Sequence, residues 1–460
     1  MCANIGKVCQ PEKVTLQRKA IELSYFAPEW LSLHHEIKCP ETASAYKKIC
    51  CKMKNNRSLS KLVGLYLIIL AVSFSCKKDE QEHEYSYFVS KELVYSYDKE
   101  YIKSMIGPIS GSIPEVSALA SKVISDISIY KIVYSTNVDG RQINASGLVC
   151  VPLAQGEYPV ISFQNGTNTI NANAPSEAPA NFQLIGLVAS MGYVVVVADY
   201  PGFGESSALA HPYLVKDPMV QSLVDLLYAV KELPGKELPE LKIKNEYYLM
   251  GYSLGGWATL ALHKELELNY NNDFKLKGSL CGAGPYNILL LLQNMVDKPS
   301  FHMPVYIAYI LNAYKSYHQF SNPVSDILNE PYVSRTMTLF DGSLGMNQIN
   351  AQLTTSIDEL LTTGFRSGFE TAPQYAPVRQ ALIDNSISGW KTNVPLRLVH
   401  GSGDTQVDPV STEEIYIEMV EAGTSTDLIE KVIVPGDHSE AAVPAIVQGI
   451  FFINELRDQD

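Results

Sequence analysis

Short apolar runs alternate with longer amphipathic segments through most of the chain after about residue 155. The apolar runs predict strands, at residues 160–163, 194–198, 247–250, 277–281, 396–400 and 430–434. Helical spacing of apolar positions predicts helices, at residues 182–191, 219–233, 257–268 and 443–456. Strands that alternate with helices are typical of a mainly parallel sheet flanked by helices, so the pattern predicts an α/β fold.

Three stretches depart from this alternation. Residues 129–135 and 143–151 alternate apolar and polar positions around Asp139-Gly140, which predicts a β-hairpin. The stretch from residue 88 to about 128 has a mixed pattern, and we expect it to be helical in part. Residues 287–390 contain apolar runs of helical spacing without a strand signal. We expect them to form a helical cap over the carboxyl ends of the strands, where ligands bind in such folds.

The N-terminal residues carry a different signal. Basic residues follow Met53 and precede an uncharged apolar run at 62–74 that is too short to span a bilayer comfortably. A basic start, a short apolar core and a small residue at the cut predict an export signal. We therefore expect a signal peptide at 53–75 and a polar tether at 76–87. Residues 1–52 precede this complete signal, so we interpret them as an upstream extension from an early start codon.

Composition excludes several functions. The chain of 460 residues carries a formal net charge of −13, which argues against a nucleic-acid partner. Five of its eight cysteines precede residue 52, and their spacing fits neither a disulfide scaffold nor a zinc site. We expect no metal ion, and we expect Cys150 and Cys281, in apolar runs, to be buried free thiols.

The run Gly251-Tyr-Ser253-Leu-Gly255 lies between a predicted strand and a predicted helix. A serine in this context sits on a sharp turn with its side chain exposed, and the flanking glycines allow the strained backbone. The amide of Leu254 begins the helix, where unpaired N–H groups attract negative charge. The alternative is a glycine-rich turn with an idle serine, but the strand and helix around the motif favour a nucleophile.

A serine hydroxyl is a weak nucleophile unless a base removes its proton. His438 is the candidate base because it follows the last predicted strand in a loop near the C-terminus. His400 ends a strand, and we expect a structural role for it.

The base in turn needs a carboxylate that orients it. Asp404 follows the strand at 396–400 by a short glycine loop, which places it at the same sheet edge as Ser253. Its rivals are Asp408, expected to cap the next helix, and Asp437, which adjoins the histidine.

These motifs, together with Asp199-Tyr-Pro-Gly-Phe-Gly204-Glu-Ser206 and His211-Pro-Tyr213, resemble those of α/β hydrolases over about residues 125–457. More narrowly, they resemble the secretory lipase group, which pairs a Gly-Thr oxyanion loop with Asp-Tyr-x-Gly-x-Gly and a helical lid before the acid. The order Ser253, Asp404, His438 matches the triad order of this fold. The resemblance implies a core at 88–286 and 391–460, with the cap at 287–390 inserted before the strand that carries the acid.

The resemblance also implies a second oxyanion donor besides the Leu254 amide. In this fold the loop after the strand at 160–163 usually reads His-Gly-X, and X donates its amide. Here the loop reads Gln164-Asn-Gly-Thr167, so Asn165 replaces the histidine and Thr167 is the expected donor.

The junction Ser75-Cys76, followed by Lys77-Lys-Asp-Glu80, resembles the lipobox of Bacteroidetes lipoproteins. There, such a charged tail can accompany export to the cell surface. The resemblance implies a lipid on Cys76 that anchors the chain to the bacterial outer membrane. The alternative is an ordinary signal peptide followed by an incidental cysteine.

The sequence therefore predicts a serine esterase or lipase that cleaves carboxylic esters through an acyl-enzyme, without a metal or organic cofactor. The substrate is expected to be a lipid, glycan or small-molecule ester, with the cap forming the acyl or alcohol pocket. One alternative is a serine peptidase with the same triad, although no repeat is present that could build the propeller often attached to such peptidases. Another is a surface-binding module without catalysis, against which the intact triad argues.

Overall fold

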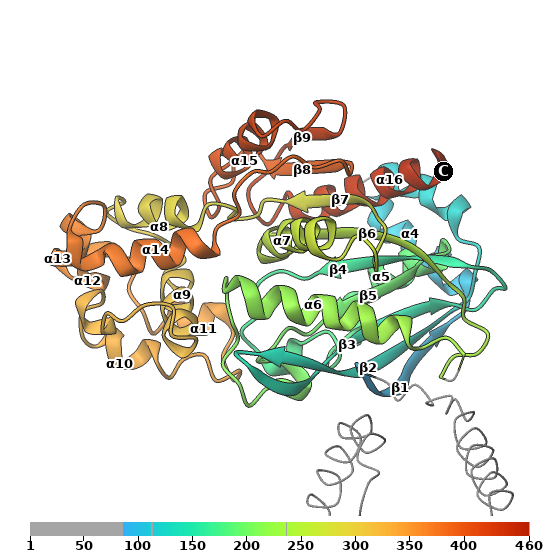
Figure 1. Ribbon diagram of the computed structural model, residues 1–460, viewed down its shortest axis with the longest axis horizontal. Helices are drawn as coiled ribbons and strands as arrows, with labels where there is room; N and C mark the ends of the chain where they lie inside the picture. The colour runs from blue at the N-terminus through green and yellow to red at the C-terminus, as the bar shows by residue number, and fades with distance from the viewer. Residues whose placement is uncertain (1–85, 112–113, 236, 460) are drawn as a thin grey trace, which may run out of the picture. The chain divides into compact units, whose positions relative to one another are not determined.

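The computed structural model describes residues 86–111, 114–235 and 237–459, which build one nine-stranded sheet (Figure 1). Its strand order is β1-β2-β3-β5-β4-β6-β7-β8-β9. β2 (Ile127–Val138) and β3 (Arg141–Pro152) form the predicted hairpin around Asp139-Gly140, both of which have positive φ. The strands from β4 onward run parallel to one another: β4 (Tyr158–Gln164), β5 (Val194–Ala198), β6 (Ile243–Tyr252), β7 (Leu276–Gly282), β8 (Leu396–Gly401) and β9 (Ile429–Val434). The expected α/β architecture is confirmed.

Helices cover both faces of the sheet, which explains why its central strands are apolar throughout. In β5, Val194 and Val196 pack into one core cluster and Val195 and Val197 into the other. α6 (Lys216–Lys231) and α7 (Leu254–Asn269) cover the first face. The second face is covered by α5 (Gln183–Ser190) and α16 (Ala442–Gln459), with α4 (Lys99–Ser110) and the 3₁₀ segment η2 (Pro114–Lys122) at its margin. α15 (Val410–Glu421) lies between β8 and β9 in the chain.

The strand order places the loop that follows β4 beside the turn that follows β6 and contains Ser253. β4 lies between β5 and β6, so the chain leaves β5 on one side of β4 and returns on the other as β6. Gln164, at the end of β4, pairs in register with Gly251 near the end of β6. This is the switch point of the sheet, where the loops after two adjacent strands separate and leave space for a ligand.

One strand was missed by the sequence pattern. β1 (Phe88–Tyr97) begins the stretch that was expected to be partly helical, and the helices α4 and η2 follow it. β1 pairs antiparallel with β2 at the sheet edge, and of its ten residues only Phe88 is buried. Its start is fixed by the Glu232 carboxylate, which accepts hydrogen bonds from the amides of Ser86, Tyr87 and Phe88. An exposed edge strand has little hydrophobic patterning, so its pairing partner determines its structure.

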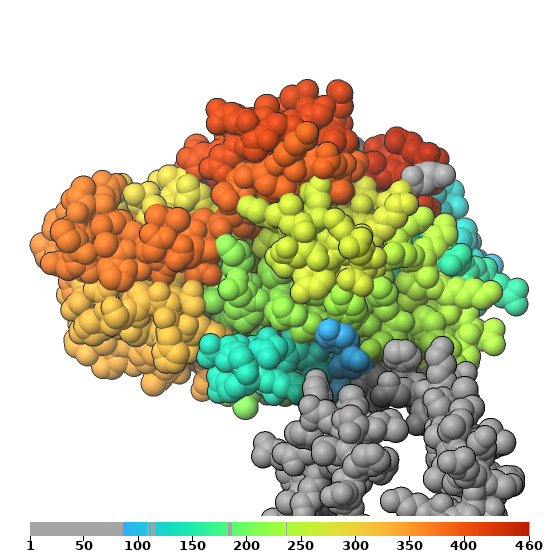
Figure 2. All heavy atoms as spheres, viewed as in Figure 1, coloured from blue at the N-terminus to red at the C-terminus, as the bar shows by residue number. Residues whose placement is uncertain are grey.

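Helices make up the segment between β7 and β8, from α8 (Ile288–Val296) and α9 (Val305–Ser316) to α14 (Ala376–Asn385). The shorter helices between them are α10 (Tyr332–Thr336), α11 (Met346–Asn350), α12 (Ile357–Leu360) and α13 (Thr363–Gly368). These residues form a lobe at one end of the molecule (Figure 2). Tyr309 and Tyr314 of α9 attach it to the core, since their hydroxyls donate to the carbonyls of Asn168 and Leu214.

The predictions for residues 1–52, for the signal peptide at 53–75 and for Cys76 lie outside the described residues, as does the tether up to residue 85. Among the helices that the structure does describe, none combines the length and apolarity that crossing a membrane requires. Cys150 and Cys281 are free and buried, and burial raises the pKa of both thiols.

A buried carboxylate joins three segments of the α/β core. Asp199, which follows β5, is 1% exposed. Its Oδ2 accepts hydrogen bonds from Ser146 Oγ at 2.5 Å and Ser176 Oγ at 2.6 Å, and its Oδ1 accepts one from the Ser176 amide at 2.7 Å. Burial raises the pKa of Asp199, although these hydrogen bonds oppose the rise. The network connects β3, the end of β5 and the segment before α5, which indicates a structural role for Asp199.

We expect Asp199→Ala to lower the free energy of unfolding by about 3 kcal/mol, because it leaves buried donors without an acceptor. Chemical denaturation monitored by circular dichroism measures this change. The control is Asp217→Ala, which removes an exposed carboxylate from the first turn of α6 and should cost less than about 1 kcal/mol. Equal effects of the two substitutions would contradict the structural role of the network.

Candidate active site

Ser253 occupies a strained turn between β6 and α7. Its backbone has φ 60° and ψ −124°, which is rare for any residue other than glycine. The turn is held from both sides: the Ser253 amide donates to the Gly282 carbonyl at 2.8 Å, and the Trp257 amide donates to the Ser253 carbonyl at 3.1 Å. Strain of this kind persists only where the surrounding structure imposes it, and it is concentrated at functional sites.

Two glycines after Ser253 allow α7 to approach its neighbours. A Cβ atom on Gly255 would lie 1.9 Å from the Gln164 carbonyl oxygen, and one on Gly256 would lie 2.2 Å from the Gly282 carbonyl oxygen. A side chain at position 255 would therefore push the helix away from the end of β4 and its loop, and one at position 256 would push it away from the end of β7. The amide of Leu254 begins α7, and the first amides of a helix have no partner within it.

His438 joins Ser253 to Asp404. The Ser253 Oγ lies 2.8 Å from His438 Nε2, and His438 Nδ1 lies 2.5 Å from Asp404 Oδ2. An ionised carboxylate can accept a hydrogen bond but cannot donate one, so His438 Nδ1 carries the hydrogen. His438 Nε2 is then unprotonated and can accept a hydrogen bond from the Ser253 hydroxyl. The Tyr252 hydroxyl donates to the His438 carbonyl at 2.7 Å and so holds the loop that carries the imidazole.

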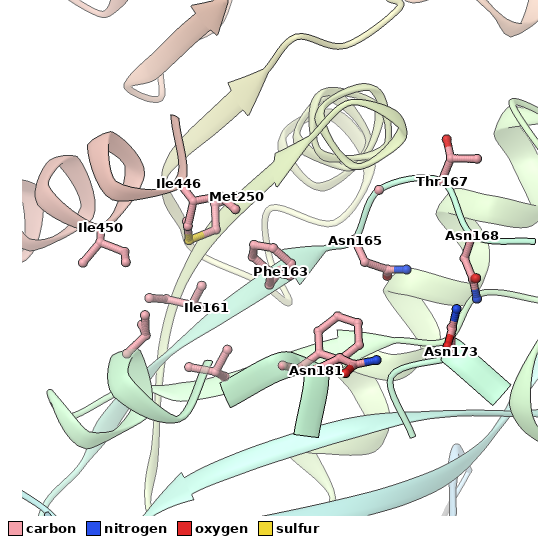
Figure 3. A pocket seen from close by; sticks show the side chains of 14 residues that line it. Ile161, Phe163, Asn165, Thr167, Asn168, Asn173, Asn181, Met250, Ile446 and Ile450 are labelled. Atoms are coloured by element: carbon pink, nitrogen blue, oxygen red, sulfur yellow. The ribbon is translucent and has the colours of Figure 1, made fainter. Parts of the chain in front are cut away.

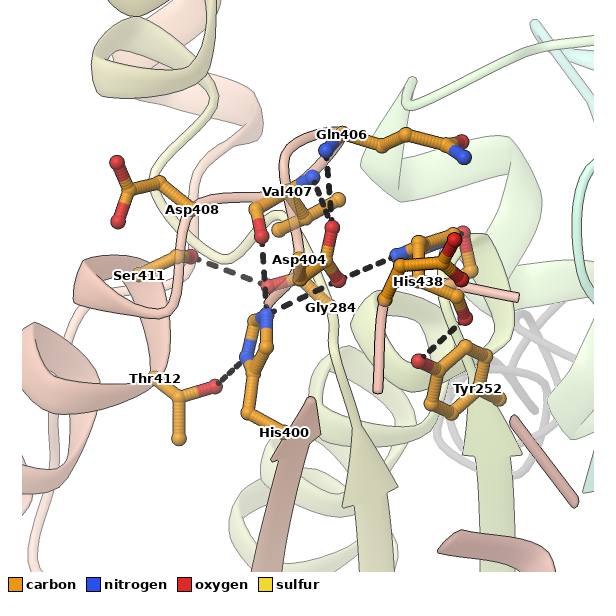
Figure 4. Close-up of polar contacts among 12 residues, drawn as sticks. Tyr252, Gly284, His400, Asp404, Gln406, Val407, Asp408, Ser411, Thr412 and His438 are labelled. Carbon is orange, nitrogen blue, oxygen red and sulfur yellow. Dashed lines mark hydrogen bonds and ion pairs between the residues drawn. The ribbon is translucent and has the colours of Figure 1, made fainter. Parts of the chain in front are cut away.

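Asp404 is buried and accepts hydrogen bonds at both oxygens (Figure 4). Its Oδ1 accepts from the amides of Gln406 at 2.9 Å and Val407 at 3.0 Å. Its Oδ2 contacts His400 Nε2 at 3.2 Å in addition to His438. Burial alone would raise the pKa of Asp404, but the hydrogen bonds from the two histidines outweigh it and hold that pKa well below its usual range. The carboxylate is therefore ionised at neutral pH.

His400 was expected to be structural, but its contact with Asp404 was not foreseen. Its Nε2 also lies 3.0 Å from the Val407 carbonyl, so that nitrogen faces two acceptors and carries the hydrogen. Thr412 Oγ1 lies 2.6 Å from Nδ1 and donates to it. A histidine at the end of a buried strand, four residues before an aspartate in the next loop, is the sequence signal that could have indicated this pair.

The two rival carboxylates have other partners. Asp408 Oδ1 accepts from the Val410 amide at 3.0 Å, at the beginning of α15. Asp437 Oδ1 accepts from the amides of Ser439 and Glu440 at 2.8 and 2.9 Å. Both carboxylates thus satisfy backbone amides within their own turns.

The loop after β4 lies against the beginning of α7 and is fixed by two tyrosines. Tyr200 Oη donates to the Asn165 carbonyl at 3.0 Å, and Thr167 Oγ1 lies 3.2 Å from Tyr213 Oη. This arrangement brings the loop that was expected to supply the second oxyanion donor next to the turn at Ser253. In the described part of the chain, no group of three or more His, Cys, Asp or Glu side chains could hold a metal ion.

We expect Gly255→Ala to destabilise the protein and to lower reaction of Ser253 with a fluorophosphonate, because the added methyl collides with the Gln164 carbonyl. Gly107→Ala in α4 is the control, since apart from its two chain neighbours nothing lies within 4 Å of its Cβ position; because Pro108 follows it, alanine there should change the stability by no more than about 1 kcal/mol and leave labelling unchanged. Thermal unfolding and labelling rates measure both effects. A Gly255→Ala protein with unchanged melting temperature and labelling would refute the close packing.

Solved structures share this fold. A hydrolase from Legionella pneumophila superposes with a TM-score of 0.72 at 24% identity, covering 82% of this chain and 99% of that one. The rice cell wall degrading esterase LipA from Xanthomonas oryzae gives a TM-score of 0.68 at 23% identity, with 82% and 98% coverage. Candida antarctica lipase A in its closed state gives 0.59 at 15% identity, with 83% and 84% coverage. No curated protein sequence matches the chain.

A family model supplies the functional class. The model described as secretory lipase matches residues 175–450, which contain the nucleophile turn, the cap and the His438 loop. This match favours ester hydrolysis over the peptidase and binding-module alternatives. Because it spans more than half of the chain, the protein is a carboxylic ester hydrolase of the α/β-hydrolase fold and belongs to the secretory lipase family.

Proposed function

We propose that Ser253, His438 and Asp404 form the catalytic triad and cleave esters through an acyl-enzyme. The observation that carries the proposal is the unbroken chain of contacts from Ser253 Oγ through the imidazole to Asp404 Oδ2, at 2.8 and 2.5 Å. These are the distances expected between a nucleophile, its base and the group that orients the base.

In the first step, Ser253 Oγ attacks the ester carbonyl carbon while His438 Nε2 takes the hydroxyl proton. The imidazolium that forms is stabilised by the ionised Asp404. The same nitrogen then donates its proton to the departing alkoxide, which leaves as the alcohol. A water molecule repeats the sequence on the acyl-enzyme, releasing the carboxylic acid and restoring Ser253.

The negative oxygen of the tetrahedral intermediate requires preorganised donors. We assign the amides of Leu254 and Thr167 to this role, since one begins α7 and the other lies in the loop packed against that helix. The positive end of the α7 dipole adds to the stabilisation. His400 is proposed as a positioning residue, because its Nε2–H holds Asp404 from the side opposite His438.

We expect Ser253→Ala to abolish fluorophosphonate labelling and to lower kcat for p-nitrophenyl esters by at least about 10³-fold. Asp404→Asn should lower kcat by about 10³–10⁴-fold with the fold intact, because the amide no longer fixes the imidazole tautomer or stabilises its charge. Asp408→Asn is the matched control, since the amide oxygen can still accept from Val410. Retained labelling in Ser253→Ala would refute the nucleophile, and an equal loss in Asp408→Asn would refute the choice of acid.

We also propose that the mature protein is an outer-membrane lipoprotein anchored through Cys76, acting on lipid, glycan or small-molecule esters within reach of the bacterial envelope. The support is the apolar run that ends in Ser75-Cys76 and the charged residues behind it. Two or more acyl chains on one cysteine would give stable membrane attachment.

The anchor is tested by expressing the full chain in a Bacteroidetes host. The wild type should fractionate with membranes and incorporate radiolabelled palmitate, whereas Cys76→Ala should lose both properties. Cys150→Ala provides the control, because this buried free cysteine stays in the mature chain and its loss should leave both properties unchanged. Labelled, membrane-bound Cys76→Ala protein would eliminate the proposed anchor.

A further inference from the structure

Helix α9 of the cap, together with the residue that ends it, presents four tyrosines to the α/β core. The spacing of these tyrosines places them on one side of the helix. Each hydroxyl donates a hydrogen bond to a core residue: Tyr306 to Gln406 Oε1 at 2.8 Å, Tyr309 to the Asn168 carbonyl at 3.0 Å, Tyr314 to the Leu214 carbonyl at 3.1 Å and Tyr317 to the Ala210 carbonyl at 2.7 Å.

Three of these contacts fix the position of α9. Tyr314 and Tyr317 hold its second half against the segment at 210–214. Tyr309 holds it against the loop that follows β4, in which Asn168 lies (Figure 3). The Tyr309 ring also stacks on the Tyr213 ring, with the centroids 4.3 Å apart and an angle of 3° between the planes. Packing and hydrogen bonds thus set the position of the first turn of α9, which carries Tyr306.

The fourth contact is to the loop that carries the proposed catalytic acid. Gln406 accepts from the Tyr306 hydroxyl through its side chain, and its backbone amide donates to Asp404 Oδ1 at 2.9 Å (Figure 4). The Val407 amide donates to the same oxygen at 3.0 Å. The orientation of the carboxylate therefore depends on the conformation of the residues that follow it, and a single residue connects that conformation to the cap.

Packing between this loop and the cap helix α8 is incomplete. A cavity of about 140 Å³ lies between them, and Asp404, Gln406 and Val407 are among the residues that line it. A segment that borders a cavity has fewer packing contacts to hold it in place. The position of the loop therefore depends more strongly on its hydrogen bonds, including the one from Tyr306.

The Tyr306 hydroxyl remains a donor over a wide range of pH. Burial and the negative charge of Asp404 raise the pKa of Tyr306 to about 12. A protonated phenol can donate to an amide oxygen, whereas a phenolate cannot. The hydrogen bond to Gln406 is therefore retained at neutral and moderately alkaline pH.

We propose that Tyr306 of the cap is a positioning residue for the triad, which acts through Gln406 to hold the loop of Asp404 in the conformation that orients His438. The inference rests on the proposed triad and adds to it a group from the cap. Cap and core then form one active site, because the acid is fully positioned only when α9 lies against the core.

The experiment compares Tyr306→Phe with Gln406→Met, which removes the acceptor and keeps a long side chain. Each should lower kcat for p-nitrophenyl butyrate by about three- to tenfold, the contribution of one hydrogen bond. KM should stay within about twofold of the wild-type value, because the orientation of the imidazole matters in the transition state and not in substrate binding. Unchanged kcat in both variants would overturn the proposal.

The double variant Tyr306→Phe/Gln406→Met tests whether the two residues act together. Because both substitutions remove the same hydrogen bond, the kcat of the double variant should equal that of either single variant. Losses that multiply would mean that the residues act independently. A loss confined to Tyr306→Phe would mean that its hydroxyl acts without Gln406. Either result would overturn the proposal.

Tyr317→Phe is the matched control, because it removes a hydroxyl presented by the same helix to a core carbonyl outside the acid loop. It should lower the melting temperature about as much as Tyr306→Phe does and leave kcat unchanged. Circular dichroism verifies that each variant is folded. An equal loss of kcat in Tyr317→Phe would mean that any weaker attachment of the cap slows the reaction, which would overturn the specific role of Tyr306.

Failure of the proposed function has a different signature, which Asp404→Asn reveals with the same ester. If Asp404→Asn retained the wild-type kcat, the acid would be wrongly assigned, and the inference would fail together with the triad. If Asp404→Asn lost activity while Tyr306→Phe and Gln406→Met did not, the triad would stand and only the role of Tyr306 would be overturned.

Discussion

The close approach of α7 to the loop after β4 is the constraint on which the site depends. β4 and β6 are parallel neighbours, so their carboxyl ends emerge side by side. The helix after β6 can then lie against the loop only because position 255 has no side chain, since a Cβ there would be 1.9 Å from the Gln164 carbonyl. This single contact brings the turn at Ser253 and the beginning of α7 close to the loop that contains Asn165.

The imidazoles and amides that contact Asp404 all donate hydrogen bonds to its carboxylate. Asp404 is a buried anion that receives hydrogen bonds from two imidazoles and two amides, so its pKa stays well below the usual range despite burial. A buried carboxylate with these donors is a fixed negative charge, and in the proposed mechanism it would favour a positive imidazole at His438 when the serine proton is transferred. His400 contacts the same carboxylate oxygen as His438, so in the proposed mechanism it would position Asp404 without taking part in the proton transfer.

The core and the cap meet at the loop that follows β4. The cap is attached through the hydroxyls of α9, which bond to carbonyls of the core, including that of Asn168 in the loop after β4. A cavity of about 430 Å³ beside this loop is lined by the sheet, α5, α16 and the loop itself, and no residue of the cap is among those that line it (Figure 3).

Local patterns in the sequence determined the order of strands and helices, the turn at Ser253 and the candidates His438 and Asp404, because periodicity, glycine spacing and position after a strand act over a few residues. The edge strand β1, the contact of His400 with Asp404 and the support from Tyr252 were decided only in the tertiary structure. The same holds for the cavity, whose walls come from segments between residues 161 and 450. These features depend on distances between residues far apart in the chain, or on which side of a turn a side chain emerges, and neither quantity is encoded in a local pattern.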